Sequence, residues 1–259
     1  MNDILRFELD GPVGTITFNR PRALNAINLD MSRAMVRLAG EIDGVKGMKV
    51  VVMRGAGSHF MAGGDIRIFK DTPENRLRTL DELIDGFHVF IRMLRRIPQP
   101  VVSAVSGAAA GGGFSLALAA DIIVADATAK FTPAYRMLGT TPDGGGTFFL
   151  PRLVGQRMAA RLLLAGDTLG AEEAHAIGLV QVLDRSGTGA ELERVVASLS
   201  RNSAPAAAST KSLLSGGELE ALDVHLDAEK RSFLNCAGGA DFVEGVDAFL
   251  EKRPPRFAS

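Results

Sequence analysis

Two glycine-rich segments, each directly after a short apolar run, constrain the fold of this chain more than any other feature. GAGSHFMAGGD follows the apolar run Lys49–Arg54, and SGAAAGGG follows Val101–Val105. Apolar runs of this length between turn residues are typical of buried strands. The first glycine-rich segment cannot form regular structure, and glycine lets a backbone approach a ligand or another backbone closely. We therefore expect two strands that end in closely packed loops.

Strand and helix patterns alternate from about residue 48 to 131. Pro73–Arg96 has the amphipathic pattern of a long helix, the second glycine-rich segment leads into a helix through Leu116–Ala119, and Ile122–Ala125 has the pattern of another strand. This alternation favours an α/β architecture with parallel strand pairing.

The two ends of the chain differ from this middle part. The N-terminal end has the pattern of a β-hairpin, Ile4–Leu9 with Val13–Phe18, followed by a helical pattern after Asn28. After Gly144 the chain is largely helical. Its expected elements are a strand at Leu179–Leu183 and helices at Ser203–Ser215, Leu219–Leu234 and Asp241–Lys252.

Composition excludes several classes of protein. The net charge is −1 and no long basic run occurs, which argues against a nucleic-acid partner. Val101–Ala120 has the length of a membrane span, but its glycines and serines favour a buried strand, loop and helix. Cys236 is the only cysteine, so no intramolecular disulfide can form. The N-terminal residues lack the apolar run of a secretory signal, and we expect a cytoplasmic protein without a membrane association.

The glycines and histidines match neither nucleotide-binding nor metal-binding patterns. The triple glycine Gly111–Gly113 lacks the Lys-Ser/Thr of a Walker loop and the spacing of a dinucleotide-binding fingerprint. The histidines His59, His175 and His225 are scattered singly, so we expect no metal site.

Four segments, in this order and spacing, resemble the crotonase (enoyl-CoA hydratase/isomerase) superfamily. They are FNRPRALNAIN at Phe18–Asn28, FMAGGDI at Phe60–Ile66, SGAAAGGGFSLALAADI at Ser106–Ile122 and GTTPDGGGTFFLPRLVG at Gly139–Gly155. The resemblance spans nearly the whole chain and ends with FLEKRPPRF at Phe249–Phe257, which resembles a common tail of the superfamily. The resemblance implies a spiral of repeated ββα turns over residues 1–200 and a helical C-terminal trimerisation region over residues 201–259. It also implies a homo-trimer or a hexamer, and no cofactor, because coenzyme A is part of the substrate.

The same resemblance implies an oxyanion hole for a thioester enolate. Two fixed backbone N–H groups hold the enolate oxygen in this superfamily, and the matching residues here are Gly64 and Gly112. Gly112 also lies where a helix is expected to begin, so the positive end of the helix dipole adds to the hole.

Contacts with coenzyme A can be carried over to seven positions. Arg22 matches a basic residue near the CoA phosphates, although a solvated surface charge is the alternative for it and for Lys252. The full set is Arg22, Ala23, Ala62, Asp65, Ile66, Phe249 and Lys252, of which the last two match tail positions that often reach a neighbouring subunit.

The chain departs from the pattern of a standard hydratase of this superfamily. Such an enzyme has two glutamates that position water, and the matching positions here hold Ser115 and Tyr135. Neither side chain can replace a carboxylate base near neutral pH without a large pKa shift. Efficient hydration is therefore not expected.

Asp143, in TTPDGGGT, lies where several isomerases of the superfamily carry their catalytic aspartate, and the run PDGGGTFFLPRLVG looks closest to the ring-opening isomerase of phenylacetyl-CoA degradation. A single carboxylate suffices to move a proton from C2 to C4, provided that an apolar pocket raises its pKa. Pro-Asp-Gly is also an ordinary turn sequence, so a purely structural Asp143 is the alternative. The expected acyl pocket consists of Phe114, Ser115, Tyr135 and Leu138.

His88, on the long helix, is the other catalytic candidate. It matches an active-site histidine of 4-chlorobenzoyl-CoA dehalogenase, whose nucleophilic aspartate matches Asp143. A packed or surface histidine is the structural alternative.

The sequence thus favours an enoyl-CoA isomerase, with other functions left open. One is a hydratase with a non-standard site, in which water is held by Asp143 alone or by another carboxylate such as Glu74 or Glu82. The others are a dehalogenase-like enzyme on an aroyl-CoA and a non-catalytic acyl-CoA binder.

Overall fold

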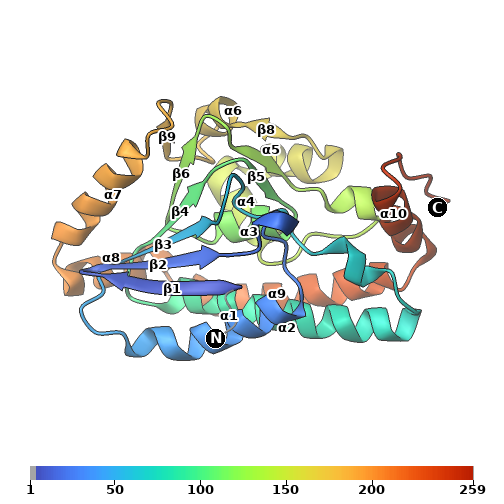
Figure 1. Ribbon diagram of the computed structural model, residues 1–259, viewed down its shortest axis with the longest axis horizontal. Coiled ribbons are helices and arrows are strands. Elements are labelled where there is room, and N and C mark those ends of the chain that lie inside the picture. Colours follow the sequence, from blue (N-terminus) through green and yellow to red (C-terminus); the bar gives the residue numbers. More distant parts are fainter. Residues whose placement is uncertain (1–3, 259) are drawn as a thin grey trace.

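The computed structural model describes residues 4–258. The first three residues, on which the expectation of no secretory leader partly rests, lie outside the described residues. A large twisted sheet forms the centre of the molecule, and its strand order is β1-β2-β3-β4-β6-β9 (Figure 1). Its strands are β1 (Leu5–Asp10), β2 (Val13–Phe18), β3 (Val50–Gly55), β4 (Val101–Val105), β6 (Ile122–Asp126) and β9 (Val182–Asp184).

The strand pairing confirms both the hairpin and the parallel sheet. β1 and β2 pair antiparallel, with Leu5 opposite Phe18, while β2, β3, β4, β6 and β9 are all parallel. The apolar run of β3 has no polar face because both sides of the sheet are covered. Val51 and Met53 pack into the main core, whereas Val50 and Val52 pack with Val195 of the helix on the other face.

Long helices cover the main-core face of the sheet. α1, α2 and α9 lie side by side below the sheet in Figure 1, and α7 and α8 lie at the end opposite α10 and the C-terminus. The Asn28 side chain caps α1 by accepting a hydrogen bond from the N–H of Met31 at 3.0 Å. α2 spans Pro73–Arg96, as the sequence predicts. The six longest helices are α1 (Leu29–Glu41), α2 (Pro73–Arg96), α7 (Ala190–Arg201), α8 (Ala204–Ser215), α9 (Glu218–Ala237) and α10 (Ala240–Leu250).

A second, smaller sheet was not expected from the sequence. It joins β5 (Ala108–Ala110), β7 (Lys130–Thr132) and β8 (Leu169–Gly170), strands of two or three residues that are too short to leave a periodic pattern. The helices near it are α3 (Gly112–Leu118), α4 (Gly146–Val154), α5 (Gln156–Ala160) and α6 (Ala171–Ala176). This sheet places the second glycine-rich segment at the start of α3.

The strand expected at Leu179–Leu183 is shorter and begins later, at Val182. The N–H groups of Leu179 and Val180 both donate to the Ala174 carbonyl, at 2.9 and 3.1 Å, and so close the end of α6. These two residues are therefore not available for strand pairing.

The C-terminal helices confirm the expected ranges to within a few residues and pack on the rest of the chain. α9 contacts α2 and α4. Leu213 and Leu214 of α8 are each 81% exposed, and the trimer or hexamer stays a prediction. Within residues 4–258 no helix has the length and apolar character needed to cross a membrane.

Candidate active site

The two glycine-rich segments pack directly against each other. Met61 and Ala109 form an isolated parallel bridge, in which the N–H of Met61 donates to the Ala108 carbonyl and the N–H of Ala110 donates to the Met61 carbonyl, both at 2.9 Å. A Cβ added at Gly113 would lie 2.1 Å from the Met61 carbonyl oxygen. This closeness explains why glycine is needed at Gly113, and it brings both loops to one cavity.

Gly64 and Gly112 both line that cavity, whose volume is about 570 Å³. Within residues 4–258 the N–H groups of these two glycines have no hydrogen-bond acceptor. Gly112 is the first residue of α3, where a helix leaves its N–H groups unpaired. The structure thus brings the two glycines together as the resemblance implies, with their N–H groups free to bind an oxygen.

Asp143 lies in the turn that precedes α4 and also lines the cavity. The side chain is buried, and burial raises the pKa of its carboxyl to about 6, against the opposing effect of a hydrogen bond from Tyr135. The Tyr135 hydroxyl donates to Oδ1 of Asp143 at 2.5 Å. Burial, together with the Asp143 charge, raises the pKa of Tyr135 far above its ordinary value, so the phenol stays a donor.

The two positions that hold glutamates in standard hydratases are adjacent in space. The Ser115 hydroxyl lies 3.1 Å from the Tyr135 hydroxyl. Ser115, Tyr135 and Asp143 therefore form one buried hydrogen-bonded chain that contains a single carboxylate.

The predicted acyl-pocket residues divide into two groups. Tyr135 and Leu138 line the cavity as predicted, whereas the prediction is wrong for Phe114 and Ser115, which are buried within α3 and do not line it. The long helix α2 supplies much of the apolar wall, and other residues come from two short helical turns and from the C-terminal helices. The residues of α2 are Leu80, Leu83, Ile84 and Phe87, and the others are Phe69, Met137, Phe233 and Leu250.

All seven residues predicted to contact coenzyme A line the same cavity, and Phe249 and Lys252 reach it from their own chain. Asp65 is held between two arginines, Arg20 at 3.0 Å and Arg67 at 2.9 Å. Burial opposes ionisation of Asp65, but the hydrogen bonds from Arg67 and Arg20 hold its pKa below the ordinary value. The Asp65 side chain thus fixes the loop and offers no base.

His88 does not line the cavity. Its Nε2 accepts a hydrogen bond from the N–H of Gly144 at 3.2 Å, next to Asp143. Burial, with the nearby charges of Arg92 and Lys230, lowers the pKa of His88 to about 3, so the ring is neutral and can accept this bond.

No metal centre is evident in the part of the chain that the structure describes. Nowhere in residues 4–258 do three or more histidine, cysteine, aspartate or glutamate side chains cluster in a way that could hold a metal ion.

Comparison with known proteins decides the family. Residues 8–259 match the family described as enoyl-CoA hydratase/isomerase. The chain belongs to the enoyl-CoA hydratase/isomerase family. It is 35% identical to a 1,2-epoxyphenylacetyl-CoA isomerase of Escherichia coli K12, over 99% of both chains, and 34% identical to a probable enoyl-CoA hydratase of Rhodobacter capsulatus, over 98% and 97%. Its fold matches the crystal structure of an enoyl-CoA hydratase from Mycobacterium avium subsp. paratuberculosis, with a TM-score of 0.89, 32% identity and 99% of both chains covered.

Membership of the hydratase/isomerase family confirms the crotonase fold that the sequence motifs predict. The names of the relatives include both an isomerase and hydratases, so the family alone does not fix the reaction.

Glu229 is a buried residue next to the Asp143 turn, and the sequence analysis does not predict its role. It comes from α9, and its carboxylate accepts hydrogen bonds from the N–H groups of Gly145 at 2.7 Å and Thr147 at 2.9 Å. Burial raises the pKa of Glu229 to about 7, although these hydrogen bonds oppose the rise. The sequence does carry a signal that Glu229 is buried. At helical spacing it falls on the same face of α9 as the apolar residues Leu222, Leu226 and Phe233, which are buried.

Proposed function

We propose that this chain is an enoyl-CoA isomerase in which Asp143 moves a proton within the substrate. The Asp143 carboxylate removes a proton from C2 of a 3-enoyl thioester, and the released electron pair forms a dienolate. The N–H groups of Gly64 and Gly112 hold the negative charge on the thioester oxygen. The Asp143 carboxyl then returns the proton at C4, which leaves the double bond between C2 and C3.

The observation that carries this proposal is the isolation of Asp143. Among the residues that line the cavity, within residues 4–258, only Asp65 and Asp143 have carboxylates, and Asp65 is paired with two arginines. Asp143 has no cation partner among the described residues, and burial brings its pKa to about 6. A carboxyl with this pKa exists in both protonation states near neutral pH, as a proton shuttle requires.

Hydration has weaker support. Activating water calls for carboxylates at the positions of Ser115 and Tyr135, which are a hydroxyl pair here. The substitutes considered from the sequence, Glu74 and Glu82, are exposed and lie outside the cavity lining, and Glu82 pairs with Arg33 on the surface. Much of the cavity wall consists of apolar side chains, which favours a reaction that needs no bound water.

The substrate in this proposal is a CoA thioester with an apolar acyl group. Arg22 and Lys252, which line the cavity and are exposed, suit the CoA phosphates. The phenylalanine and leucine side chains of the wall suit a hydrocarbon chain or ring. The name of the Escherichia coli relative, an isomerase of a phenylacetyl-CoA derivative, supports isomerisation.

Asp143→Asn tests the proposal and separates an isomerase from an acyl-CoA binder. Asn keeps the size of the side chain but removes the base, so turnover of a 3-enoyl-CoA should fall by about 1000-fold or more, the range for general acid–base catalysis combined with loss of the only base. Calorimetric titration with the same thioester should give an unchanged affinity. Asp43→Asn, an exposed surface change, is the matched control. Full activity in Asp143→Asn would overturn the proposal.

A further inference from the structure

The turn that carries Asp143 is held by two helices that are distant in sequence. Gly144 and Gly145 both have positive φ angles, 63° and 82°, so the turn has little conformational preference of its own. The N–H of Gly144 donates to Nε2 of His88 on α2, at 3.2 Å. The N–H groups of Gly145 and Thr147 donate to the carboxylate of Glu229 on α9, and the Thr147 hydroxyl donates to the same carboxylate.

Both anchoring side chains are sequestered from the substrate. His88 is 1% exposed and Glu229 is 5% exposed, and neither lines the cavity. An acid or base at either position would have no path to C2 or C4 of a bound thioester. Apart from the Thr147 hydroxyl, the groups around Asp143 that they contact are backbone N–H groups, which a buried turn must satisfy.

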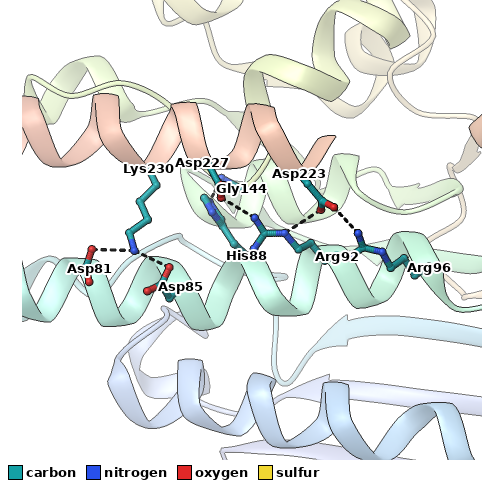
Figure 2. A network of polar contacts seen from close by, with 9 residues as sticks. All are labelled: Asp81, Asp85, His88, Arg92, Arg96, Gly144, Asp223, Asp227 and Lys230. Atoms are coloured by element: carbon teal, nitrogen blue, oxygen red, sulfur yellow. Dashed lines mark hydrogen bonds and ion pairs between the residues drawn. The ribbon is translucent and has the colours of Figure 1, made fainter. Parts of the chain in front are cut away.

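The helices that present these anchors are tied to each other by ion pairs, as Figure 2 shows. Lys230 of α9 pairs with Asp81 and Asp85 of α2, at 2.8 and 2.6 Å. Farther along, α2 arginines pair with α9 aspartates: Arg92 with Asp223 at 3.0 Å and with Asp227 at 2.8 Å, and Arg96 with Asp223 at 2.5 Å. Single exposed pairs contribute little, but a network on both sides of His88 fixes the register of the two helices.

We propose that His88 and Glu229 are positioning residues that hold the Asp143 turn and thereby aim its carboxylate at the substrate. This inference rests on the proposed function of Asp143. A free Asp143 turn would sample several conformations because of its two glycines, and a displacement of about 1 Å in a reacting group can cost about 100-fold in rate. Because His88 and Glu229 come from two helices that are joined by ion pairs, they hold the turn in one conformation.

The test uses His88→Leu, which removes the acceptor without changing a charge, and His88→Gln, which restores an acceptor at a similar reach. In His88→Leu, kcat for a 3-enoyl-CoA should fall by about 10- to 100-fold while KM stays within about threefold, since the substrate wall is intact. His88→Gln should recover most of the loss. Glu229→Gln should also lower kcat, because its NH₂ cannot accept from the turn, and Glu220→Gln on the exposed face of α9 is the control.

A second readout is independent of the reaction. The carboxyl carbon of Asp143, labelled with ¹³C, reports its pKa by NMR titration. Loosening the turn hydrates the carboxylate, so its pKa should fall from about 6 towards the ordinary 3.8 in His88→Leu and return in His88→Gln. If the wild type lacks isomerase activity but this pKa moves as described, the positioning role stands and the proposed function fails. An unchanged pKa in His88→Leu, or equal kcat in Leu and Gln variants, would overturn the positioning role.

Discussion

Replacing Asp143 by Asn should stabilise the fold at neutral pH while it removes activity. The buried carboxyl of Asp143 titrates at about 6 in the folded protein and has an ordinary pKa of 3.8. Each pKa unit corresponds to about 1.4 kcal/mol, so ionising this group costs the folded state about 3 kcal/mol. Asn resembles the protonated acid in size and polarity and avoids this cost.

The raised pKa of Asp143 determines how the stability of the fold depends on pH. A carboxyl whose folded pKa is raised binds more protons in the folded state, so stability falls as pH rises from about 4 to about 6. Asp143→Asn should therefore match the wild type near pH 4 and become up to about 3 kcal/mol more stable above pH 6.5. Burial also raises the pKa of Glu229 in both proteins, and the Asp143 charge adds to that rise only in the wild type, so this contribution enlarges the difference in the same direction.

Urea denaturation followed by circular dichroism at several pH values measures this difference. The chain has no tryptophan, and its one tyrosine is Tyr135 in the site itself, so a helix signal is a better probe than fluorescence. A stability gain that develops between about pH 4 and about pH 6 supports the argument. A variant that is less stable than the wild type at pH 7.5 would refute it, because the carboxylate would then be a net stabiliser of the fold.

Three further predictions follow from the geometry of the site. Tyr135→Phe removes a hydrogen bond that lowers the pKa of Asp143, so the acid limb of the pH profile of kcat/KM should move from about 6 to higher pH; a limb that stays in place or moves lower would contradict this. Gly113→Ala places a Cβ 2.1 Å from the Met61 carbonyl oxygen and should lower the free energy of unfolding, measured by urea denaturation, by about 1–3 kcal/mol. The control Gly44→Ala adds a Cβ that meets no neighbouring group within 4 Å, and its free energy of unfolding should be nearly unchanged. Arg22→Ala should raise KM for a CoA thioester by about tenfold, the value of one hydrogen bond to a charged group, and leave KM for the matching pantetheine thioester unchanged; equal changes for both would exclude a phosphate contact.

Much of the fold could be predicted from the sequence, because long periodic elements carry strong local signals. The α2 range and the β4 range match the predictions to the residue. The second sheet was missed because its strands have two or three residues and pair across distant parts of the chain. Leu179 and Val180 follow α6, and their apolar character predicts strand, although their N–H groups donate to the Ala174 carbonyl.

The candidate site could be predicted where a motif carries the chemistry. The two glycines, Asp143 and the residues expected at the CoA end line one cavity. Contacts between distant helices could not be predicted. The acceptor role of His88 depends on the N–H of Gly144, 56 positions later, and that of Glu229 depends on the N–H of Gly145, 84 positions earlier. Sequence spacing does not encode such proximity without knowledge of the fold.

Product analysis of the wild type in deuterated water tests most directly whether Asp143 moves a proton within an enoyl thioester. The purified protein is mixed with a 3-enoyl-CoA and, separately, with a 2-enoyl-CoA, and the products are followed by mass spectrometry. An isomerase should move the double bond, incorporate solvent deuterium through exchange on the Asp143 carboxyl and add no water. Rapid addition of water to the 2-enoyl-CoA without migration of the double bond would contradict the assignment of Asp143 as the proton carrier.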